Sequence, residues 1–220
     1  MITLHYHPSN ASFAPHILLQ ELGVPFALQR VDRDRGEHKS PAYLLLNPNG
    51  LIPVLVDGEL VLYETAAICL HLADTHPAAG LAPALATPER AHLYKWLMWM
   101  TNTLQATLIH YFYGDRLVDS GNTAGARQVR AHAQARAVQC LQQLDAHLAA
   151  NAAHQRGPWM MGDEYSLLDP YALMLCRWTR GFDASPARSF AHIGPYLQRV
   201  LARPAVQRVL VTEQLAEPLV

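Results

Sequence analysis

The sequence predicts an α/β lobe followed by an all-helical lobe. Short apolar or alternating segments, which are typical of strands, occur only in the first third of the 220-residue chain. After about residue 76 this strand pattern disappears, and apolar residues at helical spacing continue toward the end. We therefore expect two domains, which cover residues 1–78 and 88–220.

In the first lobe we expect the order strand, helix, strand, short helix, strand, strand, helix. The first helix has apolar positions at helical spacing over 13–22 and stops at Gly23. Asp57-Gly58 is a strong two-residue hairpin signal between the last two strands. The predicted strands are residues 2–6, 27–31, 53–57 and 60–63, and the helix after the last strand is residues 64–73.

In the second lobe the pattern is helical from Glu89 onward, after a linker rich in proline and glycine. Residues 93–113 are hydrophobic almost all round, which predicts a helix at the centre of the lobe. A second helix is expected over 123–150. Ser166-Leu-Leu-Asp169 predicts a capping box, in which the serine oxygen accepts from the third helical N–H and the aspartate accepts from the serine N–H.

The composition indicates a globular protein with a small or neutral partner. Half of the residues are hydrophobic and the formal net charge is −1 with neutral histidines, so no strong field favours nucleic acid or an anionic membrane. Cys69, Cys140 and Cys176 lie far apart without the spacing of a disulfide framework or zinc cluster. Because apolar runs fall short of about 18 residues and the amino terminus has no leader pattern, we expect a cytoplasmic protein.

The stretch from Tyr6 to His16, YHPSNASFAPH, leads from a strand through a polar turn into a helix. The first N–H groups of a helix are unpaired and carry partial positive charge. Such a turn therefore favours an anion or a thiolate. A plain helix cap is the alternative interpretation.

Two further stretches would suit an extended peptide with an amino-acid head group. A cis bond between Ile52 and Pro53 would turn the backbone groups of Ile52 outward, although such bonds are usually trans. Thr65, at a helix start, would offer its hydroxyl and N–H to a carboxylate, while Glu64 would face an ammonium. Capping of the helix is the alternative role for this pair.

Two histidine-containing segments remain. His38 and Lys39 lie in an exposed loop and would bind a second carboxylate, unless they are simply solvated. His5 and His7 share one face of a strand, as metal ligands can, but no third ligand is placed with them. We expect no metal site.

Four motifs occur in a characteristic order along the chain: NPNG-L-IPVL from Asn47, ETAAI from Glu64, SLLD from Ser166 and RPAV from Arg203. With these motifs, the chain resembles the cytosolic glutathione transferases along nearly its whole length. This resemblance implies a thioredoxin-like first domain, an all-helical second domain and glutathione as co-substrate. It also implies that Ile52, before a cis Pro53, pairs with the cysteinyl backbone of glutathione. Glu64 and Thr65 would hold the γ-glutamyl end, and His38 with Lys39 the glycyl carboxylate.

Tyr6 and the run Ser12-x-x-Pro15-His16 resemble the bacterial beta-like group of that family. That group has a cysteine where this chain has Ala11, which excludes a mixed disulfide with glutathione at this position. We expect Asn10 to stabilise the thiolate of glutathione instead, with Ser12 assisting.

We therefore expect a homodimeric glutathione transferase that promotes thiolate attack on a hydrophobic electrophile. Phe13, Tyr111, Tyr113 and Trp178 are the candidate walls of the electrophile pocket, because Trp178 falls where the beta-like group has a pocket tryptophan. The missing cysteine leaves an alternative open, a non-catalytic member of the family that binds glutathione or a hydrophobic ligand.

Overall fold

A four-stranded sheet forms the centre of the first lobe in the computed structural model, which describes residues 1–220. The strand order is β2-β1-β3-β4, with β1 parallel to β2 and antiparallel to β3, and with β3 antiparallel to β4. The predicted strands are confirmed to within a residue at each end. The strands are β1 (Ile2–Tyr6), β2 (Phe26–Arg30), β3 (Val54–Asp57) and β4 (Leu60–Tyr63).

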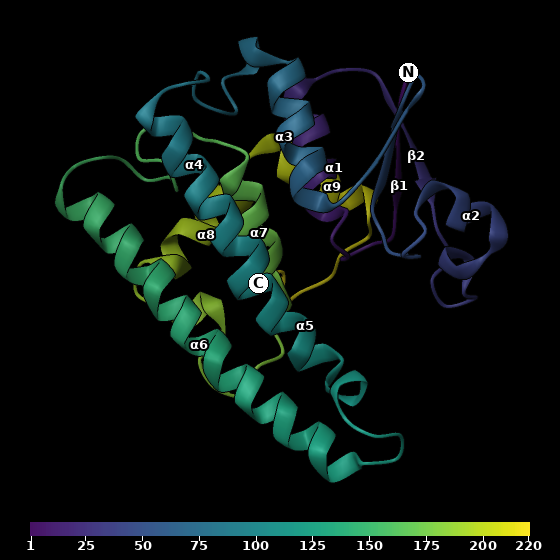
Figure 1. Ribbon diagram of the computed structural model, residues 1–220. Helices are drawn as coiled ribbons and strands as arrows, with labels where there is room; N and C mark the ends of the chain where they lie inside the picture. Colours follow the sequence, from purple (N-terminus) through teal and green to yellow (C-terminus); the bar gives the residue numbers. More distant parts are fainter.

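Helices cover both faces of the sheet (Figure 1). Helices α1 and α3 pack on the face turned toward the second lobe, while the short α2 lies on the other face. On that outer face Val31, Tyr43, Ile52 and Val54 form a small separate core. The first lobe thus has the predicted thioredoxin-like architecture. Its helices are α1 (Phe13–Leu22), η1 (Glu37–Lys39), α2 (Pro41–Leu46), α3 (Thr65–Thr75) and η2 (Pro77–Ala79).

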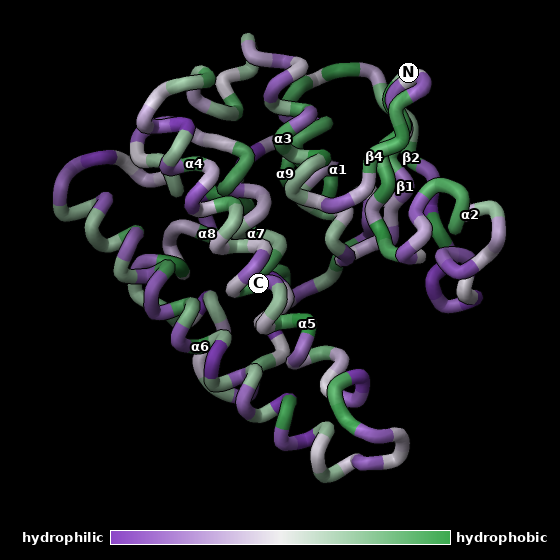
Figure 2. The backbone as a smooth tube through the Cα atoms, viewed as in Figure 1, coloured by the Kyte–Doolittle hydropathy of each residue, from purple (hydrophilic) through white to green (hydrophobic).

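The second lobe is entirely helical, as predicted. Its longest helix, α6, runs along the edge of the molecule farthest from the sheet (Figure 1). Figure 2 shows hydrophilic and hydrophobic residues alternating along α6, as expected for a helix with one buried side. The elements are α4 (Pro88–Trp99), η3 (Met100–Gln105), α5 (Ala106–Phe112), η4 (Gly114–Leu117), α6 (Thr123–Ala153), α7 (Leu168–Trp178), η5 (Ala187–Ser189), α8 (Ile193–Leu201) and α9 (Pro204–Thr212).

The apolar segment 93–113 differs from the expected single central helix. It consists of α4, one stretch of π-helix (η3) and α5, so its helical phase changes midway. Its inner face is buried, but Tyr94 and Met98 remain 39% and 43% exposed. The segment is therefore not enclosed by the single chain.

The capping box forms at the start of α7 with one change. The Ser166 N–H donates to Asp169 Oδ2 at 2.8 Å, as predicted, but Ser166 Oγ accepts from the Leu168 N–H at 3.3 Å. Asp169 also accepts from the Met160 N–H and from the Tyr196 hydroxyl, each at 2.9 Å. This buried carboxylate therefore ties α7 to the preceding loop and to α8.

The two lobes share one hydrophobic core. Helix α1 packs against α7 and α9, and the main cluster of buried apolar side chains runs through both lobes. Arg203 of the loop before α9 contacts Glu21 of α1 with two hydrogen bonds, at 2.5 and 2.9 Å.

None of the helices combines the length and apolar character needed to span a bilayer.

Candidate active site

A cleft between the lobes brings together most of the predicted site residues. Its volume is about 590 Å³, and both lobes contribute to its lining. Ser12, Phe13 and Tyr111 do not line it. The predicted residues that do are Asn10, His38, Lys39, Ile52, Pro53, Glu64, Thr65, Tyr113 and Trp178.

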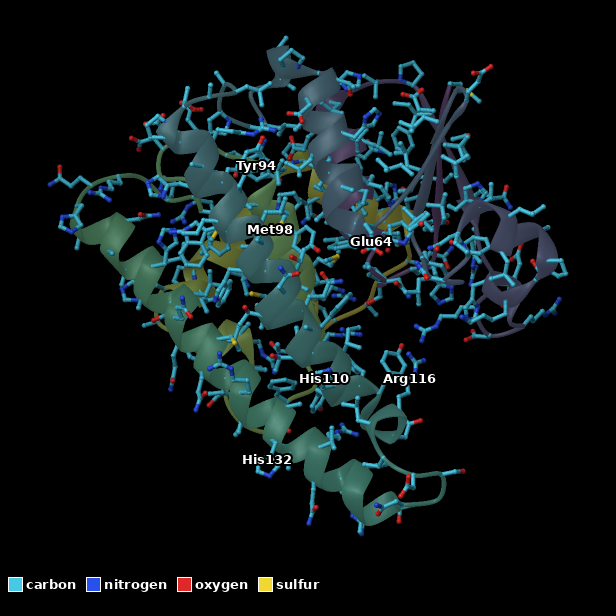
Figure 3. All side chains as sticks on the ribbon, viewed as in Figure 1. Glu64, Tyr94, Met98, His110, Arg116 and His132 are labelled. Carbon is cyan, nitrogen blue, oxygen red and sulfur yellow. The ribbon has the colours of Figure 1, made fainter.

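The start of α3 forms one end of the cleft. The first backbone bond of this helix is donated by Ile68, so the N–H groups of Thr65, Ala66 and Ala67 have no partner in the chain. No side chain caps this helix, which removes the capping alternative for Glu64 and Thr65. Free N–H groups at a helix start favour a carboxylate, and the exposed carboxylate of Glu64 stands directly beside them. This arrangement suits the two charges of an amino-acid head group (Figure 3).

The middle of the cleft is formed by the Ile52-Pro53 segment before β3. The bond between these residues is cis. Neither backbone group of Ile52 has a hydrogen-bond partner in the chain. An N–H and a C=O left free beside a strand can pair with an extended peptide.

The loop before Ile52 packs closely against η1, which carries His38 and Lys39. Gly50 has φ +57°, and a Cβ there would lie 2.7 Å from Lys39 Nζ and 2.8 Å from the His38 carbonyl. Lys39 donates to the Asn49 carbonyl at 3.1 Å. Burial, followed by the positive charges of Lys39, Arg33 and His7, lowers the pKa of His38. His38 is therefore neutral at pH 7 and lies in a positive field.

The opening turn separates the roles of Asn10 and Ser12. The Oδ1 atom of Asn10 accepts from the Ala11 N–H at 2.6 Å, and its Nδ2 donates to no group of the chain. Ser12 is fully buried, and its hydroxyl donates to the His7 carbonyl at 3.0 Å and accepts from the His7 N–H at 3.3 Å. Of these two residues, only Asn10 therefore offers a free side-chain donor to the cleft.

A residue from the far end of the chain supports this turn. Glu213, just after α9, is 3% exposed and accepts from the Ser9 N–H at 2.8 Å through Oε2. Its other oxygen lies 2.8 Å from Nδ1 of His16, which is fully buried in α1. Ser9 has φ +61°, a left-handed conformation that is unusual for serine. Glu213 thus holds the turn beside Asn10, a role that sequence reasoning did not identify.

The apolar wall of the cleft differs from the predicted one. Phe13 is 1% exposed in the common core, and Tyr111 is 5% exposed with its hydroxyl bound by Arg130 of α6 at 2.9 Å. Ile109 and Phe112 line the cleft instead, together with Trp178. Because 93–113 is apolar on every side, its sequence does not show which face of α5 turns toward the cleft.

Three arginines from separate segments also line the cleft, and sequence reasoning missed all three: Arg33, Arg116 and Arg180. Arg33 donates to the Tyr113 hydroxyl, and the guanidinium of Arg116 lies 3.9 Å from the centre of the Tyr113 ring. None of the three forms an ion pair within the chain. Local sequence carries no signal for this cluster because the fold alone brings the segments together.

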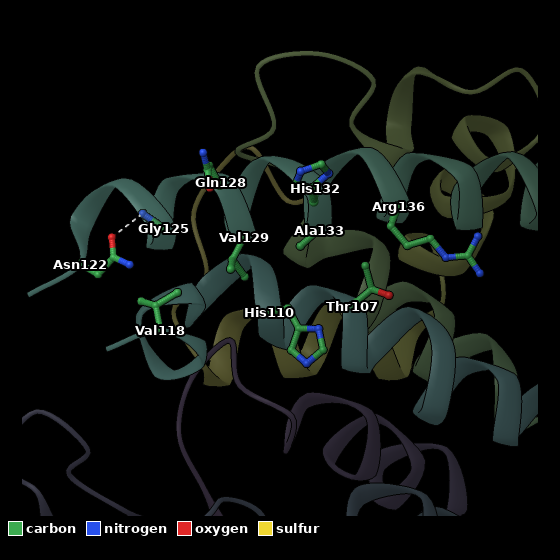
Figure 4. A pocket seen from close by; sticks show the side chains of 10 residues that line it. All are labelled: Thr107, His110, Val118, Asn122, Gly125, Gln128, Val129, His132, Ala133 and Arg136. Carbon is green, nitrogen blue, oxygen red and sulfur yellow. Dashed lines mark hydrogen bonds between the residues drawn. The ribbon is translucent and has the colours of Figure 1, made fainter. Parts of the chain in front are cut away.

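A second groove lies between α5 and α6 (Figure 4). Its volume is also about 590 Å³, and its lining includes Thr107, His110, His132 and Arg136. The last three of these side chains are exposed to solvent. None of the predicted site residues lies there, so the cleft between the lobes is the candidate active site.

Comparison with known proteins agrees with this geometry. Residues 1–74 match the model of the glutathione S-transferase N-terminal domain. Glutathione S-transferase GST-4.5 of Xanthomonas campestris is 32% identical over 96% of this chain and 98% of its own. Glutathione S-transferase GstA of Escherichia coli O157:H7 is 29% identical over 96% of this chain and 98% of its own.

Solved structures agree as well. A glutathione transferase homologue from Sulfitobacter with bound glutathione is 27% identical, has a TM-score of 0.85, and matches over 98% of this chain and 99% of its own. The bacterial beta class enzyme of Sphingomonas chungbukensis is 28% identical, has a TM-score of 0.80, and matches over 97% of this chain and all of its own. With the fold, the cleft and these relatives in agreement, the chain belongs to the glutathione S-transferase family.

Proposed function

We propose that this protein is a glutathione transferase that uses the cleft between its lobes to join glutathione to a hydrophobic electrophile. The observation that carries this function is a row of free backbone groups and charged side chains along the first lobe. These are the free N–H groups of α3 beside Glu64 at one end, the free backbone groups of Ile52 in the middle, and Lys39 beyond them. Together they match an extended peptide with a carboxylate at each end and one ammonium.

Each part of glutathione has a proposed partner in this row. The γ-glutamyl carboxylate binds Thr65 and the start of α3, and Glu64 binds the ammonium. The cysteinyl backbone pairs with Ile52, which Pro53 follows. His38 and Lys39 bind the glycyl carboxylate. These partners support the proposal because all of them line one cleft and none is ion-paired elsewhere.

The sulfur of glutathione then lies at the opening turn. There Asn10 stabilises the thiolate, in a turn where the beta-like group has a reactive cysteine. Ala11 offers no side-chain donor, whereas Nδ2 of Asn10 is free to donate to a thiolate. The thiolate attacks an electrophilic carbon, a carbon–sulfur bond forms, and the leaving group departs with its bonding electrons. The thiol proton passes to solvent, because an amide has no proton-accepting role here. The space for the electrophile is lined by Ile109, Phe112, Tyr113 and Trp178.

We also propose that the protein is a homodimer. Tyr94 and Met98 lie one helical turn apart on an exposed side of α4 (Figure 3). In the edge strand β4, Leu60 is 40% exposed and Val61 is 41% exposed. Exposed apolar side chains and a free strand edge are both features that a second copy of the chain would cover.

Two further proposals follow from the sequence. The domain limits 1–78 and 88–220 are supported by the linker between η2, which ends at Ala79, and α4, which begins at Pro88. A cytoplasmic location is supported by the three cysteines, which are unpaired and buried.

The test of the binding site compares Glu64→Ala with Ser9→Ala by calorimetry with glutathione. We expect Glu64→Ala to weaken binding by about 1.5 to 3 kcal/mol, because the substrate ammonium loses its charged partner. Ser9 borders the cleft but its side chain forms no hydrogen bond, so Ser9→Ala has a smaller effect. Equal affinities for the two variants would contradict the site assignment.

A non-catalytic binding protein is the second candidate function, and Ala11 favours it because the position lacks a reactive side chain. Incubation with glutathione and a small panel of electrophiles, measured against the uncatalysed rate, separates the two. Glutathione binding without rate enhancement for any electrophile would favour the binding protein.

A further inference from the structure

The cleft carries more positive charge than glutathione requires. Arg33, Lys39, Arg116 and Arg180 line it, and Glu64 is the only carboxylate among the lining residues. None of the four cations is ion-paired within the chain. Unpaired guanidinium groups that share one cleft repel one another, so a ligand that supplies negative charge is favoured there.

Glutathione alone does not neutralise this cluster. It has two carboxylates and one ammonium, and its thiolate adds one further negative charge, for a net charge of −2. The cleft has four permanent positive charges and one negative charge, for a net charge of +3. In the proposed binding mode the start of α3 and Lys39 bind the two carboxylates, and the three arginines remain without an anionic partner.

These arginines line the same cleft as the apolar wall where the second substrate would lie. Arg116 lies four residues beyond Phe112, and its guanidinium lies 3.9 Å from the centre of the Tyr113 ring. Arg33 reaches the same ring from the first lobe and donates to its hydroxyl. Arg180 lies two residues after Trp178, and its Nη1 is held by the Arg177 carbonyl at 2.9 Å.

Part of the apolar surface in the same cleft is aromatic. Trp178 and Phe112 meet edge to face, with their ring centres 6.3 Å apart. Flat apolar bodies pack well against such a surface. A guanidinium group can form paired hydrogen bonds with a carboxylate, sulfonate or phosphate.

We propose that the electrophile is an amphipathic anion, with an apolar, preferably aromatic body against Phe112 and Trp178 and an oxyanion group bound by Arg116 and Arg180. This proposal rests on the proposed transferase function and names its substrate class. It requires that the same electrophile with a neutral group in place of the anion be a markedly poorer ligand and substrate.

The test uses 4-chloro-3,5-dinitrobenzoate and its neutral counterpart, 4-chloro-3,5-dinitrobenzamide. In both, the glutathione sulfur bonds to the ring carbon that carries chlorine, the carbon–chlorine bond breaks, and chloride leaves with the bonding electrons. The two conjugates with glutathione can be prepared without enzyme, so their affinities are measurable by calorimetry independently of catalysis.

We expect the wild-type protein to bind the carboxylate conjugate at least about tenfold more tightly than the amide conjugate. Arg116→Gln and Arg180→Gln should each reduce this preference by about three- to tenfold and leave the affinity for glutathione itself nearly unchanged. Arg127→Gln is the matched control, because Arg127 is exposed on α6 and does not line the cleft. It should retain the full preference.

Equal affinity of the wild type for the two conjugates would overturn the proposal, and so would a preference that survives in the double variant of Arg116 and Arg180. An equal loss for both conjugates in the arginine variants would also overturn it, since the arginines would then act on glutathione. Turnover of both probes at equal kcat/KM would leave the transferase function standing and reject the anionic substrate. A preserved preference for the carboxylate conjugate without turnover of either probe would support the anionic ligand and reject the transferase.

Discussion

Asn10 and Ser12 lie two positions apart in the opening turn, yet their side chains have different partners. The buried Ser12 hydroxyl forms two hydrogen bonds, both with the backbone of His7, whereas Nδ2 of Asn10 has no partner in the chain and faces the cleft. The choice between these two residues could not be made from the sequence, because both are polar residues at a helix start. We therefore propose Asn10 as the group that touches the sulfur, whereas Ser12 shapes the turn through its hydrogen bonds to His7.

At the residue scale we predict that Asn10→Ala raises the pKa of the bound thiol by about one unit. A free thiol has a pKa of about 8.5, and one hydrogen bond to a charged group contributes about 1.5 to 3 kcal/mol, which corresponds to about one to two pKa units. The thiolate absorbance of bound glutathione in the ultraviolet, followed against pH, measures this change. The effect on glutathione affinity should be smaller than that of Glu64→Ala.

Ser12→Ala is the comparison variant for this experiment. We expect it to lower the free energy of unfolding by about 1 to 2 kcal/mol, because it leaves the His7 N–H unpaired and removes one of the two donors to the His7 carbonyl. Its effect on the thiol pKa should not exceed that of Asn10→Ala. Absence of thiolate in the wild type at pH 7, or its loss in Ser12→Ala alone, would show that Asn10 is not the activating residue.

At the element scale, the start of α7 depends on a charged group inside the core. Asp169 is fully buried and accepts hydrogen bonds from Met160, Ser166 and Tyr196. Burial raises the pKa of Asp169 to about 6, although these hydrogen bonds act in the opposite direction. The carboxyl group is therefore still partly protonated in the folded protein at pH values where it is ionised in the unfolded chain.

This shift has a definite sign for stability. Between about pH 4 and pH 6 the folded protein retains a proton that the unfolded chain has released, so the contribution of Asp169 to stability falls as the pH rises. We predict that the free energy of unfolding of the wild type decreases by about 2 kcal/mol across this interval relative to Asp169→Asn, which does not titrate. Urea unfolding of both proteins at pH 4, 5, 6 and 7 measures the difference. A constant difference over this range would contradict the prediction.

The elements themselves were largely predictable from the sequence, whereas the faces that they turn to the site were not. Alternation and the Asp57-Gly58 turn locate β3 and β4 because these signals are local. The wall residues Ile109 and Phe112 depend on the rotation of α5, which a segment apolar on all sides leaves undetermined. Arg33, Arg116 and Arg180 meet only after the lobes pack together, so no local pattern could indicate them.

At the scale of the whole molecule, the exposed side of α4 predicts the association of two chains. We expect light scattering to give twice the 24.5 kDa mass of one chain. Met98→Glu should shift the protein toward the monomer at micromolar concentration, because it places a charge in an apolar interface. A soluble wild-type monomer would contradict the homodimer.

Leu45→Glu is the matched control for that variant. Leu45 is 88% exposed on α2, on the outer face of the sheet, away from α4. The Leu45→Glu variant introduces the same charge as Met98→Glu and should leave the measured mass of the dimer unchanged. A loss of dimer in both variants would indicate a general effect of charge and would not locate the interface.

The hydrogen bond between Ser9 and Glu213 joins positions 204 residues apart. Because the ribosome synthesises a chain from its amino terminus, the opening turn leaves the exit tunnel first and the group that holds it leaves almost last. A nascent chain without α9 lacks the acceptor for the Ser9 N–H, so its opening turn is incomplete. The opening turn is therefore complete only after synthesis of the chain is nearly finished.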